Sequence, residues 1–403
     1  MALIVKKFGG SSVANAERVM NVAKIIVADY AQGNDVITVV SAQGDTTDDL
    51  IEKAAEINPD GASKREMDML LSAGEQISIA LLAMAIEKLG YPVVSLLGWQ
   101  AGFETNSNYS SARIKHINNE RLRAELDKRK IVIVAGFQGI DKRENITTLG
   151  RGGSDTSAVA IAAAMGAERC QIYTDVDGVY TADPRKVKKA KKMAEIKYDE
   201  MLELATLGAQ VLNNRSVEMA KKHNVELEVI SSLTPEIKGT IVKENCKMEK
   251  MLIKGVACDK SVLCVSIIGL KDTPGMAFKI FHQLSRKKVN VDIILQSVGR
   301  NNTKDITFTV PKDMKRDTLD AIEEMKESLQ YDNVVLDDTV AKVSIVGAGM
   351  ETHPGVASKM FEALADAGIN IRMIATSEIK ISVLIDADQA DRAVNYVHDA
   401  FIN

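Results

Sequence analysis

The stretch Thr148-Leu149-Gly150-Arg151-Gly152-Gly153-Ser154-Asp155-Thr156-Ser157 decides the interpretation of the fold. It places a guanidinium, a carboxylate and several hydroxyls on a glycine-rich turn directly before the apolar run 158–165. That run predicts a helix, whose first N–H groups and positive dipole end favour a bound phosphate or carboxylate. Arg151 adds a planar fork that can hold a carboxylate in a bidentate manner. A capped helix start with a surface arginine is the plainer alternative.

A second anion site of this kind lies near the N-terminus. Residues 4–12, Ile-Val-Lys-Lys-Phe-Gly-Gly-Ser-Ser, predict a strand that runs into two glycines and then a helix around 16–30. No G-x-x-x-x-G-K-[ST] motif occurs, so the phosphate-binding lysine must precede the glycines. We expect Lys7 to meet the transferred phosphate.

The order of strand, polar loop and helix recurs along the first half of the chain, at 35–48, at 131–139 and at 171–180. Alternating strands and helices predict a mainly parallel sheet with helices on both faces. Ligands of such folds bind at the carboxyl ends of the strands, and all of these polar loops follow strands.

Composition indicates a soluble enzyme of two or three domains, with 403 residues, 46% hydrophobic and 26% charged, and a formal net charge of −4. Nucleic acid is not an expected partner. Four cysteines without C-x-x-C spacing argue against a structural zinc, and we assign no metal-ligating residue. The chain begins directly with a strand and has no apolar run of about 18 residues, so we expect a cytoplasmic protein without a membrane anchor.

Five motifs follow one another in the first 240 residues, at 7–12, 66–75, 136–139, 148–155 and 174–185. Together they resemble the motifs of aspartokinases, in the amino-acid kinase family. The resemblance implies an αβα sandwich with a mainly parallel central sheet. It also implies phosphorylation of the β-carboxylate of L-aspartate by ATP with magnesium. The product would be 4-phospho-L-aspartate, the entry to lysine, threonine and methionine synthesis.

An aspartate pocket needs an arginine fork, an acidic group for the ammonium, and hydroxyl or backbone donors, whereas phosphoryl transfer mainly needs positioned positive charge. The resemblance implies that Glu75 binds the ammonium and Arg151 a carboxylate. Lys7 would bind the phosphoryl group, oriented by Asp155. The other expected substrate-binding residues are Thr47, Gly152, Gly153 and Ser154. The expected nucleotide-binding residues are Lys7, Phe8, Gly9, Gly10, Ser41, Thr174, Asp175, Tyr180, Asp183 and Arg185.

Two features leave alternatives open. Glu75 could simply lie on the surface of the predicted helix 65–89. The apolar positions of that helix, expected in the core, are Leu70, Leu71, Ile77, Leu81 and Leu82. In addition, Gln210 stands where the family usually has a lysine that helps to hold the ATP phosphates. Either nucleotide binding is weaker here, or a neighbour such as Arg215 or Lys221 compensates.

The second half contains an internal repeat. Residues 265–269 recur as 343–347, Pro274-Gly275 recurs as Pro354-Gly355, and Asn290-Val291 as Asn370-Ile371. Each copy fits a ferredoxin-like βαββαβ unit and resembles an ACT domain, an amino-acid sensor.

The second copy ends on a helix and lacks its sixth strand, so 252–258 is predicted to complete it. The expected domains are therefore a catalytic domain at 1–243, a linker at 244–251, a first ACT domain at 260–340, and a second at 252–259 plus 341–403.

ACT units leave exposed sheet edges, which predicts a homodimer through residues 252–403. We expect feedback inhibition by lysine, threonine or both. The candidate effector-binding residues are Asp272, Thr273, Pro274, Gly275, Met276, Ala277, Asn290, Asp292, Gln296, Asn370, Ile371, Ser377 and Glu378. Met248 and Met251 leave open an internally initiated small subunit.

Three other functions are weighed against this one. Another amino-acid kinase, such as glutamate 5-kinase, would not normally carry two ACT units. A fused aspartokinase and homoserine dehydrogenase would need several hundred more residues. A catalytically silent amino-acid sensor on a kinase scaffold is the alternative from a different class. Retention of Lys7, Glu75, Arg151 and Asp155 weighs against the silent sensor.

Overall fold

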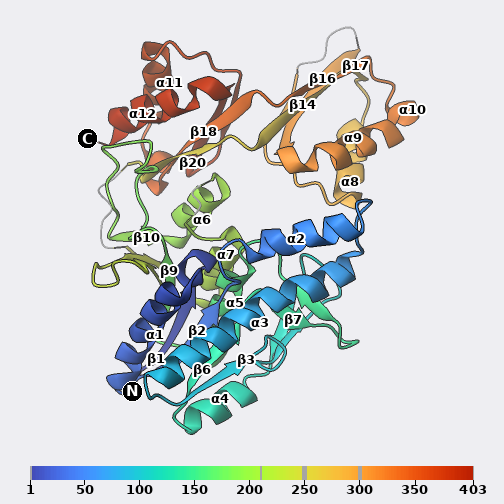
Figure 1. The fold of residues 1–403 in the computed structure, drawn as a ribbon. Helices are drawn as coiled ribbons and strands as arrows, with labels where there is room; N and C mark the ends of the chain where they lie inside the picture. The colour runs from blue at the N-terminus through green and yellow to red at the C-terminus, as the bar shows by residue number, and fades with distance from the viewer. Residues whose placement is uncertain (1, 209–210, 247–251, 298–301, 403) are drawn as a thin grey trace. The chain divides into compact units, whose positions relative to one another are not determined.

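The computed structural model describes residues 2–208, 211–246, 252–297 and 302–402 (Figure 1). The chain forms two compact units. The first contains Met1–Tyr180 and Lys191–Glu249, and the second contains Thr181–Ala190 and Lys250–Asn403.

An eight-stranded sheet forms the centre of the first unit, in the order β10-β12-β11-β9-β1-β2-β6-β3. Its strands are β1 (Leu3–Phe8), β2 (Asp35–Val40), β3 (Val93–Leu96), β6 (Ile131–Ala135), β9 (Arg169–Thr174), β10 (Glu195–Lys197), β11 (Leu227–Ser231) and β12 (Thr240–Lys243). Neighbouring strands are parallel except for β11 and β12. The central strands read as continuous apolar runs because both of their faces are buried.

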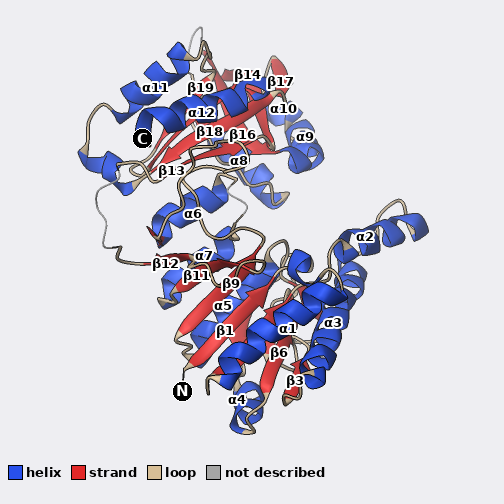
Figure 2. Ribbon diagram, turned by 60° about the vertical axis from the view of Figure 1, so that its left-hand side comes forward, coloured by secondary structure: helices blue, strands red, loops and turns tan. Residues whose placement is uncertain are grey.

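Helices cover both faces of this sheet, which confirms the predicted αβα sandwich (Figure 2). The long helices α1 (Ala16–Ala31) and α3 (Lys64–Lys88) pack on one face, and α5 (Gly153–Met165) and α7 (Asn214–His223) on the other. The other helices of this unit are η1 (Gly10–Val13), α2 (Thr46–Ile57), α4 (Glu120–Asp127) and α6 (Tyr198–Thr206). A small second sheet contains β4 (Phe103–Thr105), β5 (Ile114–Ile117), β7 (Gln138–Ile140) and β8 (Ile146–Thr148).

Helix α3 buries only part of the set that was expected in the core: Leu82 is fully buried and Leu70 and Leu71 are half-buried. Ile77 and Leu81, expected in the core, are 51% and 41% exposed. The buried positions of α3 include polar and small residues, namely Asp68, Ser72, Gly74, Glu75, Ser78, Ile79, Leu82, Ala85 and Ile86. The helix is apolar on most of its circumference, so hydrophobicity alone does not identify its inner face. Within the described chain it is also the one helix long and apolar enough to cross a membrane, a test that core helices also pass.

The second unit contains two four-stranded antiparallel sheets, in the orders β15-β16-β14-β17 and β13-β18-β20-β19. The first repeat comprises β14 (Val262–Lys271), α8 (Met276–Arg286), β15 (Ile294–Gln296), β16 (Thr303–Pro311), η2 (Lys312–Met314), α9 (Lys315–Glu324), α10 (Lys326–Leu329) and β17 (Asn333–Asp337). The second comprises β18 (Val340–Val346), η3 (Ala348–Thr352), α11 (Val356–Asp366), β19 (Met373–Thr376), β20 (Lys380–Asp386), η4 (Ala387–Gln389) and α12 (Ala390–Phe401). Strand β13 (Gly255–Asp259) pairs with β18, so the strand that precedes the first repeat belongs to the sheet of the second.

The segment Thr181–Ala190, which lies within the predicted catalytic domain 1–243, packs in the second unit. Thr181 Oγ1 lies 2.9 Å from His398 Nε2, and the Thr181 carbonyl accepts a hydrogen bond from the Val256 N–H at 2.8 Å. Ala182 and Val187 are buried in the hydrophobic core of the second repeat. The nucleotide motif predicted at 174–185 is therefore divided between the two units.

Candidate functional site

Lys7 and Asp155 meet where β1 ends and α5 begins. Lys7 Nζ lies 2.6 Å from Asp155 Oδ1, and the two side chains are only 13% and 10% exposed. The second oxygen of Asp155 accepts a hydrogen bond from the Asn213 N–H at 3.3 Å. The structure thus brings together the two residues predicted to be catalytic, and the carboxylate holds the ammonium at the start of a helix, where an anion binds well.

The glycine-rich turn before α5 is held by its own backbone geometry. Gly150 and Gly152 have φ angles of 83° and 67°, in the left-handed region that glycine tolerates best. A side chain at Gly152 would also collide with Asn213, whose amide donates a hydrogen bond to the Arg151 carbonyl at 3.0 Å. The backbone of the turn is therefore fixed, while the Arg151 side chain remains exposed and able to reach a ligand. Ser154, one residue into the helix, is buried.

Glu75 is a buried carboxylate with one unpartnered oxygen. Its side chain is 3% exposed, so the alternative that it lies on the helix surface is wrong. Oε1 accepts a hydrogen bond from the Ala42 N–H at 3.1 Å, whereas the buried Oε2 has no hydrogen-bond partner among the described residues. Burial raises the pKa of Glu75 to about 7. A ligand ammonium would satisfy Oε2, which is otherwise an unfavourable buried polar atom.

The loops predicted to bind the nucleotide follow three neighbouring strands, β2, β1 and β9. Ser41 donates its N–H to the Phe8 carbonyl at 3.1 Å. A Cβ at Gly10 would lie 2.6 Å from the Ala42 carbonyl oxygen, so only glycine permits this approach. Gly9 immediately precedes Gly10, and Thr47 lies in the first turn of α2.

Beyond β9 the predicted nucleotide residues have internal partners. Thr174 Oγ1 donates to Asp175 at 3.1 Å, and the Tyr180 hydroxyl donates to Asp177 at 2.8 Å. Asp183 and Arg185 lie in the second unit and form a bidentate pair, with both N–O distances 3.0 Å. The prediction grouped them with the first unit because the motif is continuous in sequence.

Asp68 is a residue that the sequence argument missed. It is fully buried and accepts hydrogen bonds from the Ser110 N–H at 2.9 Å and from the N–H and Oγ1 of Thr148, both at 2.8 Å. Asp68 thereby joins α3 to the strand that leads into the glycine turn. Its position inside the motif 66–75 was the available signal, but its partners lie about 40 and 80 residues away in the chain.

The two residues expected to replace the family lysine have other partners. Arg215 donates to the carbonyl oxygens of Leu149 at 2.9 Å and Ala112 at 2.8 Å. Lys221 pairs with Asp199 at 2.6 Å. Gln210 itself lies outside the described residues.

The candidate effector residues lie at helix starts and sheet edges of the second unit. Gly275, with a φ angle of 90°, precedes α8, where Met276 begins the helix after Thr273 and Pro274. Asp272 pairs with Lys304 at 2.7 Å, and Asp292 pairs with Lys342. A cavity of about 520 Å³ is lined by Gln296 together with residues of both repeats, including Arg372. The remaining candidates are Ala277, Asn290, Asn370, Ile371, Ser377 and Glu378.

Comparisons with known proteins agree with this architecture. Residues 2–231 match the amino acid kinase family, and residues 265–325 and 343–401 match the ACT domain. The chain is 49% identical to the aspartokinase of Bacillus sp. (strain MGA3), with 100% of this chain and 97% of that protein covered. It is 50% identical to the aspartokinase of Corynebacterium glutamicum, with 100% and 96% covered.

Solved structures give the same result. The crystal structure of E. coli aspartokinase III in complex with aspartate and ADP (R-state) matches with a TM-score of 0.86 at 25% identity, over 100% of both chains. The same enzyme in complex with lysine and aspartate (T-state) matches with a TM-score of 0.76 at 25% identity, again over 100% of both chains.

Proposed function

The chain belongs to the aspartokinases of the amino acid kinase family and phosphorylates the β-carboxylate of L-aspartate, and we propose that the site around Lys7, Glu75 and Arg151 carries out that reaction. The observation that carries the assignment is the buried Glu75 oxygen without a partner, because it suits the ammonium of an amino-acid substrate. Arg151 then binds a substrate carboxylate with its fork. Ser154, Thr47 and the N–H groups of Gly152 and Gly153 complete the substrate site.

Lys7 stabilises the phosphoryl group during transfer. An ordinary aspartate side chain has a pKa of about 3.9, so the attacking β-carboxylate is already ionised at neutral pH. No general base is therefore required. A cation held in place before the reaction stabilises the charge on the phosphoryl oxygens best. Lys7 is that cation, and its ion pair with Asp155 holds it in place. The loops after β1, β2 and β9 hold ATP, which supplies the phosphoryl group.

Magnesium is expected to arrive with the nucleotide. No group of three or more ligating side chains occurs within the described residues. Magnesium in kinase sites is held mostly by substrate phosphates and by one or two carboxylates. We propose Asp155 as one of them, with the ion sharing a carboxylate that already contacts Lys7 Nζ and the Asn213 N–H.

Regulation and assembly rest on the second unit. The E. coli aspartokinase III structure in its T-state contains lysine, which supports lysine as an effector here; threonine, alone or with lysine, is the other candidate. A homodimer through the ACT sheets would cover the exposed β15 residues Ile294 and Leu295, which are 50% and 40% exposed. An internally initiated small subunit remains a proposal, since Met248 and Met251 lie outside the described residues. The cellular setting that fits is the cytoplasm, at the entry to lysine, threonine and methionine synthesis.

Trapping of the acyl phosphate with hydroxylamine tests the function. The full chain is incubated with ATP, magnesium and hydroxylamine, together with aspartate, glutamate or no amino acid. We expect hydroxamate with aspartate only. A folded chain that forms none with aspartate would support the silent amino-acid sensor, and one that prefers glutamate would reassign the substrate.

A further inference from the structure

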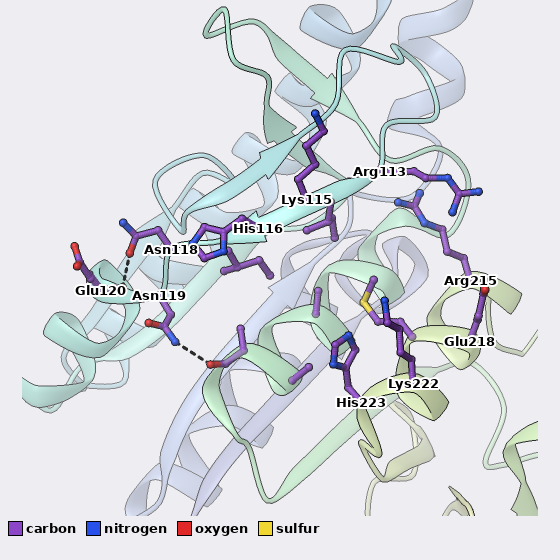
Figure 3. Close-up of a pocket in the computed structure, with 16 residues that line it drawn as sticks. Arg113, Lys115, His116, Asn118, Asn119, Glu120, Arg215, Glu218, Lys222 and His223 are labelled. Atoms are coloured by element: carbon purple, nitrogen blue, oxygen red, sulfur yellow. Dashed lines mark hydrogen bonds between the residues drawn. The ribbon is translucent and has the colours of Figure 1, made fainter.

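A cavity of about 750 Å³ lies in the first unit between β5, the second half of α5 and α7 (Figure 3). Its lining includes Ala160, Ala163 and Ala164 of α5 and Met219 of α7, which form an apolar floor. Because a helix rises about 1.5 Å per residue, Ala160 and Ala164 lie about 7.5 and 13 Å along α5 from Asp155, and none of the four residues Lys7, Glu75, Arg151 and Asp155 lines the cavity. The cavity is therefore separate from the phosphoryl-transfer site, and its volume is typical of small-molecule sites, about 300–1,000 Å³.

The rim of this cavity has more cations than carboxylates, although the whole chain is acidic. Its charged residues are Arg113, Lys115, Arg215, Lys222, Glu120 and Glu218, and it also contains His116 and His223. Within the described part of the chain, none of these four cations forms an ion pair with a carboxylate. In Figure 3 Lys115 points away from the helices, whereas Arg113 and Arg215 lie next to each other at one end of the cavity.

Arg215 is held rigidly at that end. Its guanidinium donates to the Leu149 and Ala112 carbonyls, at 2.9 and 2.8 Å, and uses two of its five N–H groups. Burial, and to a smaller extent the charge of Arg113, lowers the pKa of Arg215, while Glu218 acts in the opposite direction. Two neighbouring guanidiniums repel each other, so an anion bound between them would relieve that repulsion. Guanidinium forks match the oxygens of a phosphate group in particular.

We propose that this cavity is a second, non-catalytic site for a small phosphate monoester. The phosphate binds Arg113 and Arg215, and the apolar body lies over the alanines of α5 and Met219. A free amino acid is less suitable, because the rim has four cations against the two carboxylates Glu120 and Glu218, a balance that favours an anion over an ammonium. Arg215 also donates a hydrogen bond to the carbonyl of Leu149, two residues before Arg151. An occupant that moves Arg215 would therefore also move the substrate-binding turn. Only this last consequence rests on the proposed function.

Calorimetric titration of the full chain tests the site. Phenyl phosphate is the monoester probe, and inorganic phosphate is the probe that lacks an apolar group. ADP and aspartate are present at saturating concentration so that they occupy the catalytic site. We expect phenyl phosphate to bind the native chain more tightly than inorganic phosphate does. Arg113→Ala should weaken binding of both probes about tenfold or more, since a hydrogen-bonded charge pair is lost. Arg113→Lys should restore little of it, because an ammonium lacks the fork.

Two matched variants complete the test. Arg143→Ala removes an exposed arginine outside the cavity and should change neither affinity. Met219→Ala should weaken phenyl phosphate but not inorganic phosphate. No binding of either probe at millimolar concentration, or equal affinity of the native and Arg113→Ala chains, would overturn the proposal. Turnover with aspartate is measured separately, so a failed cavity and a failed aspartokinase assignment give different results.

Discussion

Glu75→Gln should make the protein more stable above neutral pH and a poorer enzyme at the same time. The native carboxyl has a pKa of about 7 against its ordinary value of 4.5, because burial disfavours its charge. A raised pKa means that the folded chain binds the proton more tightly than the unfolded chain. The stability linked to that proton is present below pH 4.5 and is lost as the pH rises through 7.

The size of the effect follows from the two pKa values. At pH 8 ionisation of Glu75 lowers the free energy of unfolding by about 3 kcal/mol, and at pH 5 by less than about 1 kcal/mol. Glutamine stays neutral and can still accept the Ala42 N–H, so it avoids this penalty. The melting temperature of the first unit should therefore rise by roughly 6–12 °C at pH 8 and by only a few degrees at pH 5.

Catalysis should change in the opposite direction. In the native chain kcat/KM for aspartate should increase with pH up to about 7, as Glu75 becomes ionised and able to bind the ammonium. In Glu75→Gln that inflection should disappear, and kcat/KM should fall roughly 10- to 100-fold with the loss of a charged hydrogen bond.

Calorimetric melts at pH 5 and pH 8, with steady-state kinetics over the same range, measure both effects. Glu87→Gln, an exposed position on the same helix, is the control and should leave both unchanged. Equal melting temperatures of Glu75→Gln and the native chain at pH 8, or an unchanged KM for aspartate, would refute the reasoning.

Further predictions concern the other charges of the molecule. Lys7→Ala should lower kcat by about 10²-fold or more in a folded chain, because the cation is most needed in the transition state; near-normal kcat would remove Lys7 from the mechanism. Arg151→Lys should raise the KM for aspartate, since a point charge cannot replace the fork, and an unchanged KM would mean that another cation binds the carboxylate. Asp272→Ala with Gln296→Ala should keep uninhibited turnover but shift the inhibition curve to higher lysine or threonine, with a typical coupling of about 1–3 kcal/mol. Light scattering should show a dimer, and a monomer at working concentration would contradict assembly through 252–403.

The fold was largely predictable because its signals are local. Buried parallel strands give uninterrupted apolar runs, as in 131–135, and the polar loops that follow them mark one edge of a sheet. The repeat in the second half was visible from the spacing of matching residues, and its missing strand from counting the elements of each copy. The meeting of Lys7 with Asp155 was expected from the resemblance to aspartokinases, and the structure places the two residues at the end of β1 and the start of α5.

Other features depend on which surfaces meet in space, and no local pattern contains that information. Helix α3 is apolar almost all round, so hydrophobicity does not show which of its faces is buried. Ile77 and Leu81 were expected in the core because they are apolar, and both are exposed. The motif 174–185 is continuous in sequence, yet Thr181 and the residues after it pack in the other unit. Which unit buries a segment is decided by partners such as Val256 and His398, more than 70 residues away.

The hydrogen-bond partners of Asp68 and Glu75 distinguish a buried carboxylate that stabilises the fold from one that binds a ligand. They lie seven residues apart on α3, hence on the same face of the helix, and both are buried. The carboxylate of Asp68 accepts from Ser110 and twice from Thr148, so it already has the partners that it needs and fixes the approach to the glycine turn. Glu75 has one backbone donor and one buried oxygen without a partner. A buried polar atom left in that state is unfavourable unless a ligand completes it, so the same helix face supplies both the support for the turn and the group that binds the substrate.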